Sequence, residues 1–269
     1  MKAFLKTLNA EIKKQHRNYF YSRTIYISLF LWPVLSFITT NYSFKAFDLT
    51  KSRIPYITPD NVVVYLLLGY MCMSFFRSLV QSAWRFSFER FHGTLELIFL
   101  SPGNRAAVLL GNAVSSLFES VAVIVVFTVS VLVLKAEVLN VQLLPCIAVF
   151  LLVTCMAVVW GMFLNSLFLF SRDTNFLYTV LEEPMEIFSG VKVPVSLFPL
   201  WAKVIGAVFP LTYAIEAVRR IMLMESSLYE VRTFILIGLV IIVVLLFAIS
   251  RILRIVEKHI RVTGNLTLF

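Results

Sequence analysis

Long apolar runs separated by short charged stretches form the main pattern of this sequence. A helix that crosses a membrane needs about 20 mostly apolar residues. Runs of this kind predict membrane spans at residues 24–44, 61–83, 106–134, 142–171 and 233–250. Glu119 interrupts the third run, and we expect it to form an ion pair or hydrogen bond at the edge of the span rather than to contact cargo.

The segment from residue 174 to 232 has a more broken pattern. Three glutamates interrupt its apolar first part, and prolines punctuate its second part: Glu182, Glu183, Glu186, Pro199 and Pro210. Proline removes a backbone donor and bends or ends helices. We therefore predict a short fifth span at 174–190 and a broken, partly re-entrant region at 191–232, which brings the total to six spans.

The composition agrees with this pattern. Of the 269 residues, 59% are hydrophobic and only 14% are charged, and the mean hydropathy is +0.87. Soluble globular domains carry about 25% charged residues. The composition therefore excludes a soluble domain and indicates an integral membrane protein.

The positions of Lys and Arg predict the orientation. They concentrate before the first span, between the second and third spans (Arg77, Arg85, Arg90 and Arg105), and after the last span. Because basic segments stay on the cytoplasmic side, we predict a multi-pass protein of the cell inner (plasma) membrane with both termini in the cytoplasm. The net charge of +9 suits contact with membrane lipids, and we expect no nucleic-acid partner.

Residues 1–23 have an amphipathic pattern. Phe4, Leu5, Leu8 and Ile12 recur at helical spacing, and lysines occupy other positions around the helix. Such a helix is typical of one that lies on the membrane surface. The alternative is a solvated tail that only fixes the topology.

A second amphipathic stretch lies between the second and third spans. Residues 85–104 carry an apolar stripe and a set of polar positions that face elsewhere: Phe88, Phe91, Leu95 and Phe99 against Glu89, Arg90, His92 and Glu96. Ser101, Pro102 and Gly103 then end the helix. We predict a cytoplasmic helix that can transmit force from a soluble partner.

The sequence carries no pattern of a catalytic or metal site. It lacks both the phosphate-binding loop of ATPases and the nucleophile elbow of hydrolases. Its three cysteines fall within predicted spans, and its three histidines lie far apart. We therefore expect no catalytic residues, no metal and no cofactor in this chain, so that any ATP must bind to another subunit.

Two motifs resemble those of a known family, the permease subunits of type-2 ABC exporters. The first, after the second span, comprises Glu89, Arg90, Gly93, Thr94, Leu95, Glu96, Ser101 and Pro102. The second, before the last span, comprises Pro199, Pro210, Leu211, Thr212, Tyr213, Glu216 and Arg219. Phe91 and His92 depart from the family pattern, in which many members carry further charge at this point.

The resemblance implies a dimer of permeases, homomeric or heteromeric, in which each copy binds a cytoplasmic ABC ATPase subunit that holds ATP and Mg. It assigns ATPase coupling to one set of residues: Glu89, Arg90, Gly93, Thr94, Glu96 and Pro102. The corresponding fold class is an all-α integral membrane protein. It has six transmembrane helices, an N-terminal interfacial helix, a cytoplasmic coupling helix at 85–104 and an external re-entrant helical hairpin before the sixth span.

The acidic cluster has two interpretations. Glu182, Glu183 and Glu186 could line a pathway for cargo, because carboxylates at membrane depth face a cavity or a partner. Alternatively, they are hydrated at the external mouth, or pair with Arg219 and Arg220.

The leading function is export of a drug, antibiotic or related natural product. The alternatives are export of a lipid-linked polysaccharide or teichoic acid precursor and, less favoured, an intramembrane enzyme.

Overall fold

The computed structural model describes most of the chain. The described ranges are 2–19, 61–94, 103–133, 143–168, 174–224 and 226–263, with single positions between some of them. The predicted first span, 24–44, lies largely outside the described residues.

All regular secondary structure in these ranges is helical, so the predicted all-α class is confirmed. The helices are α1 (Lys2–Tyr19), α3 (Val62–Phe91), α5 (Arg105–Val133), α6 (Leu143–Phe168), α7 (Thr174–Phe188), the short η3 (Val195–Leu197), α8 (Leu200–Val208), α9 (Pro210–Met224) and α10 (Arg232–Thr263).

Four helices of the described part are long and apolar enough to cross a membrane, namely α3, α5, α6 and α10. The pair α8 and α9 qualifies as a fifth span only if it is counted as one broken helix, because its two halves meet at 96°. Helix α7 has 15 residues with Pro184 inside, which is short of the roughly 20 that a span needs. The structure therefore supports a multi-pass membrane protein, and the number of six spans stays a prediction.

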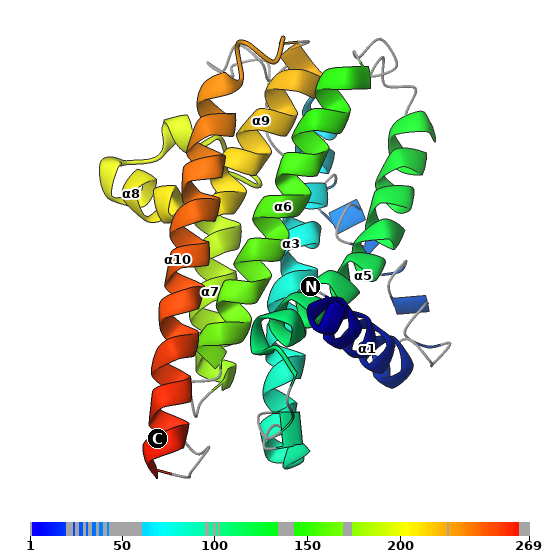
Figure 1. The fold of residues 1–269 in the computed structure, drawn as a ribbon. Helices are drawn as coiled ribbons and strands as arrows, with labels where there is room; N and C mark the ends of the chain where they lie inside the picture. Colours follow the sequence, from blue (N-terminus) through cyan, green and yellow to red (C-terminus); the bar gives the residue numbers. More distant parts are fainter. Residues whose placement is uncertain are drawn as a thin grey trace.

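Helix α3 lies at the centre of the bundle and packs against α5, α6, α7 and α9. Helix α10 lies at the side against α6 and α9, α1 lies against α5, and α8 projects from the bundle (Figure 1). Leu79 and Ala83 of α3 are fully buried. Gly161 allows α6 to approach α3 closely, since a side chain there would meet Leu79 at 3.1 Å.

Short polar side chains join α3 to α5. The hydroxyls of Ser78 and Ser120 lie 3.0 Å apart, and Asn112 exchanges hydrogen bonds with the backbone and hydroxyl of Ser82. Asn112 also donates to Asn165 of α6 at 2.7 Å. Helices in membranes commonly associate through small residues and interhelical hydrogen bonds of this kind.

The structure corrects two predictions about the segment after the second span. A separate helix at 85–104 is wrong, because α3 continues without a break to Phe91 and turns only at His92 and Gly93. The orientation argument counted Arg77 among the basic residues between the second and third spans, but Arg77 lies in the middle of α3 and within the predicted span 61–83. Both errors have one cause: charged residues mark loops in a sequence pattern, yet a helix continues past a charge that finds a partner.

Candidate functional site

The Phe91 end of α3 is shaped by a glycine. Gly93 has a φ of 68°, a left-handed conformation that ends helices and that residues with a Cβ rarely adopt. Helical structure resumes at Thr94, and the exposed Leu97 follows it. Gly93 therefore sets the direction of the segment that was predicted to couple to an ATPase.

Glu89 is held within the chain. The Lys14 ammonium of α1 lies 2.9 Å from its carboxylate, and the Thr94 hydroxyl donates to the same carboxylate. Burial disfavours the charged form of Glu89, but the hydrogen bonds from Lys14 and Thr94 outweigh this effect and hold its pKa below the usual value. The Glu89 charge is thus already satisfied without an ATPase.

Helix α1 is fixed on α5 by its polar face. Glu11 and Gln15 are buried there, with the Gln15 amide donating to Glu11 at 2.8 Å and Lys14 pairing with Glu11 at 3.0 Å. Gly111 of α5 lies directly beneath, since a Cβ on it would lie 2.8 Å from Glu11. Leu5, on the predicted membrane-facing stripe, is exposed. Helix α1 therefore joins α5 to Glu89 of α3 and leaves Leu5 outside this contact.

The other predicted coupling residues are less completely placed. Arg90 is in the last turn of α3, but its side chain is not among those described, and Glu96 and Pro102 lie outside the described residues. Arg85, one turn before Glu89, pairs with Glu119 of α5 at 3.1 Å. The expected ion pair of Glu119 is confirmed, but Glu119 lies in the middle of α5 and not at the edge of the span.

A second charged cluster connects the middle of α3 to α7. Arg77 Nε lies 2.5 Å from Glu182, and its Nη2 lies 2.9 Å from Glu186, which also pairs with Lys192 at 3.0 Å. Glu182 is only 4% exposed, whereas Glu183 is exposed. A buried carboxylate is stable only with a partner, and Arg77 is that partner.

The alternative prediction that this acidic cluster pairs with Arg219 and Arg220 is wrong. Arg220 pairs with Glu216 of its own helix at 3.0 Å. Arg219 donates to backbone carbonyls of the turn after α7, Gly190 and Val191, both at 2.6 Å. Arg77 was missed because the count of basic residues assigned it to the segment between the second and third spans, although the predicted span 61–83 contains it. The apolar residues that follow it, through Ala83, were the available indication that the helix continues.

Arg219 fastens the re-entrant region to the Val62 end of α3. It is 4% exposed, stacks 3.5 Å from the ring centroid of Tyr65, and also donates to the Tyr65 carbonyl at 3.2 Å. The turn that it reaches depends on Gly190, which has a φ of 85°. Thus Arg219 ties α9, the turn after α7 and α3 together.

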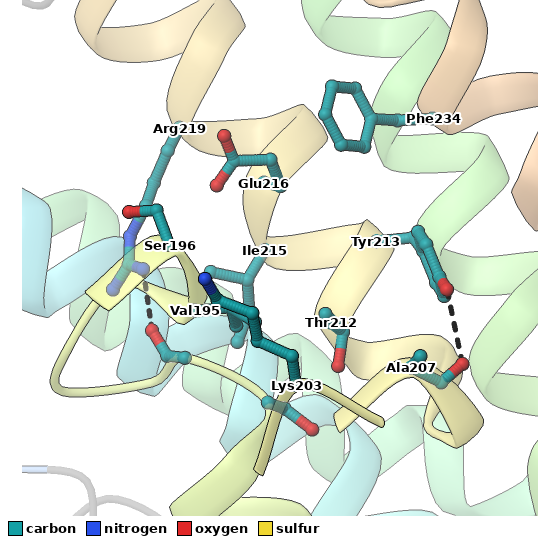
Figure 2. Close-up of a pocket in the computed structure, with 12 residues that line it drawn as sticks. Val195, Ser196, Lys203, Ala207, Thr212, Tyr213, Ile215, Glu216, Arg219 and Phe234 are labelled. Atoms are coloured by element: carbon teal, nitrogen blue, oxygen red, sulfur yellow. Dashed lines mark hydrogen bonds between the residues drawn. The ribbon is translucent and has the colours of Figure 1, made fainter. Parts of the chain in front are cut away.

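The remaining residues of the re-entrant motif shape the bend between α8 and α9. Pro199 precedes α8 and Pro210 is the first residue of α9, where a missing N–H has no cost. Thr212 donates to the Gly206 carbonyl at 2.5 Å. Beside this bend lies a cavity, shown in Figure 2, which both Lys203 of α8 and Glu216 of α9 line.

The three glutamates of the acidic cluster are not placed together as metal ligands. Among the described residues, no group of three His, Cys, Asp or Glu side chains is placed to hold a metal ion. Glu182 and Glu186 are instead engaged by cations of the chain itself. The arrangement is that of charged contacts between helices.

These features define a class of protein, a multi-pass membrane protein whose polar contacts converge on one central helix. The family model described as ABC-2 type transporter matches residues 7–223. The chain therefore belongs to the ABC-2 type transporter family and is a type-2 ABC permease subunit, a family whose members work with an ABC ATPase subunit. No curated protein matches the sequence significantly.

Proposed function

We propose that this chain forms the translocation pathway of an ATP-driven exporter for a drug, an antibiotic or a related natural product, with its termini in the cytoplasm. In this proposal two copies assemble, each with one ATPase subunit that supplies ATP and Mg. The observation that carries the proposal is the course of α3. One continuous helix of 30 residues joins the re-entrant contacts at Tyr65 to the family motif at Glu89 and Gly93.

The geometry favours a division of labour within the coupling motif. Glu89 is engaged by Lys14 and Thr94, so it serves to brace the turn at Gly93. Leu97, just after that turn, is 67% exposed and provides an apolar contact for the ATPase. Movement of the ATPase would then reach α3 through the braced turn.

Co-purification with the ATPase tests this proposal. We expect the full chain to lack ATPase activity when purified alone and to co-purify with a separate ATPase. The variant Leu97→Glu should lose most of that ATPase. The matched control is Leu197→Glu, which places the same charge at an exposed leucine beside the re-entrant bend. Equal retention of the ATPase by the wild type and Leu97→Glu would contradict the proposed contact, and ATP hydrolysis by the isolated chain would contradict the proposed function.

A further inference from the structure

The cavity beside the re-entrant bend has the features of a binding site. It measures about 240 Å³ and lies among the turn after α7, η3, α8, α9 and the start of α10. Pockets that enclose drug-sized ligands measure roughly 300–1,000 Å³. The cavity is therefore suited to a headgroup rather than to a whole drug molecule.

Two polar groups in the lining have no partner among the residues that the structure describes. Ser189 is 1% exposed, and its hydroxyl makes no hydrogen bond within the described structure. The half-buried Lys203 has no carboxylate within ion-pair distance among the described residues, in contrast to Lys192 and its partner Glu186. A buried hydroxyl without a hydrogen bond costs about 1–3 kcal/mol, which a ligand that accepts from it would remove.

The charge of the lining is positive. Lys203 and Arg219 both line the cavity, and the carboxylate of Glu216, which faces the same space in Figure 2, is paired with Arg220 at 3.0 Å. Arg219 adds its charge while its N–H groups hold the neighbouring backbone carbonyls. Electrostatic complementarity thus favours an anionic group.

The outer face of α8 is apolar. Leu200, Trp201, Val204 and Val208 are each more than 60% exposed, whereas Lys203 and Ala207 of the same helix line the cavity. In a membrane protein such a face suits acyl chains. A molecule with an anionic headgroup and acyl chains would satisfy the cavity and this face at once.

We propose that the cavity between the turn after α7 and the α8–α9 bend binds the phosphate or carboxylate headgroup of an anionic amphiphile, with Lys203 and Ser189 as its direct ligands. The acyl chains lie along the outer face of α8. This site does not depend on ATP-driven transport, so it can be measured on the permease chain alone.

Native mass spectrometry of the purified full-length chain, titrated with dioctanoyl phosphatidylglycerol, tests the proposal. Loss of a charge-assisted hydrogen bond should weaken binding about tenfold in Lys203→Gln and by a smaller factor in Ser189→Ala. Lys203→Arg should bind within about twofold of the wild type. The matched control is Lys258→Gln, which removes the same charge from the exposed end of α10.

Two further probes separate the sources of the anion. Dioctanoyl phosphatidylcholine, which has no net charge, should bind at least about tenfold more weakly than phosphatidylglycerol, and inorganic phosphate should compete only weakly. If inorganic phosphate bound as tightly as the lipid, the proposed role of the acyl chains would be overturned. Equal binding of both lipids, undiminished binding by Lys203→Gln, or an equal loss in Lys258→Gln would overturn the site.

Discussion

Helices α3 and α10 are both long enough to cross the membrane, but they are used in opposite ways. The apolar stretch of α3 has a mean hydropathy of 1.7, and 72% of it is buried inside the protein. The apolar stretch of α10 has a mean hydropathy of 3.1, and only 11% of it is buried. In a soluble protein the more apolar helix would be the more buried one. Here the more apolar helix faces outward, and the more polar one holds the contacts between helices.

The difference arises from what each helix must satisfy. Ser78, Ser82, Arg77 and Arg85 of α3 all find partners on neighbouring helices. Helix α10 exposes an apolar stripe that includes Leu236, Val240, Val243 and Phe247. Polar groups away from water are stable only when they are paired, so the helix that carries them must lie inside the bundle.

The largest expected effect follows from removing the central cation of α3. Arg77→Leu leaves Glu182 buried without its partner, and breaking a buried pair in this way costs about 3–5 kcal/mol. Reversible unfolding by SDS in mixed micelles would measure this loss. Arg251→Leu, at an exposed position of α10, should change stability by less than about 1 kcal/mol, and equal effects at both sites would break the comparison.

A leucine pair tests the apolar packing. Leu79→Ala of α3 removes a fully buried side chain, and we expect a loss of about 2–5 kcal/mol from the cavity that remains. Leu239→Ala of α10 removes a side chain that is 47% exposed and should cost well under half as much. The same unfolding assay applies, and a larger cost at Leu239 would show that α10 has a protein partner over this face.

A glycine pair tests close approach. In Gly69→Ala of α3 the added methyl would collide with the Val191 carbonyl and lie 2.5 Å from Arg219, so we expect a loss of about 1–3 kcal/mol. In Gly238→Ala of α10 the methyl meets the Met156 sulfur at 2.9 Å, a flexible side chain that can move. The gain of about 1 kcal/mol in helix propensity should offset that contact. Similar melting temperatures for the two variants would contradict this difference.

The smallest effect concerns the pair between Lys14 and Glu89, which is partly exposed. We expect Glu89→Gln to cost about 0.2–1 kcal/mol, against no measurable change for Glu230→Gln at an exposed position. Burial opposes both charges, yet the partners lower the pKa of Glu89 and raise that of Lys14.

The pH dependence of this pair follows from the two directions. The contribution of Glu89 is fully present above its usual pKa of 4.5 and is lost as the pH falls through its lower folded value. The contribution of Lys14 is fully present below its usual pKa of 10.5 and is lost only as the pH rises through a still higher value. Stability measured from pH 3 to 8 should therefore differ least between the wild type and Glu89→Gln at the acidic end, and a constant difference would contradict the ion pair.

The helices that the sequence predicts best are those bounded by charge. Helix α5 begins at Arg105 and α10 at Arg232, each one residue before the predicted span. The end of the span at residue 250 stays a prediction, and helix α10 itself continues through Arg251 and Arg254 to Thr263. An apolar run reports the part of a helix that suits lipid, and the helix itself can extend beyond it.

The contacts of the candidate sites could not be predicted in the same way. Arg77 and Glu186 are 109 positions apart in the sequence, and no local pattern relates them. The family motif did single out Arg219 and Glu89, but their partners depend on the fold. The Gly190 turn supplies the carbonyls for Arg219, and α1 brings Lys14 to Glu89.

The central proposal is that α3 carries the movement of the ATPase to the re-entrant region, through its contact with α7 at Arg77 as well as through Tyr65. The most direct test is the distance between spin labels at the exposed Val193 and Tyr229, measured by pulsed EPR in the complex with the ATPase. The three native cysteines are replaced beforehand, and the complex is compared without nucleotide and with ATP trapped by vanadate. We expect a distance change in the wild type that is reduced in the double variant Arg77→Met and Glu182→Met, which replaces both charges by apolar groups and so preserves folding. An unchanged nucleotide-dependent shift in that variant, with the ATPase still bound, would contradict the account.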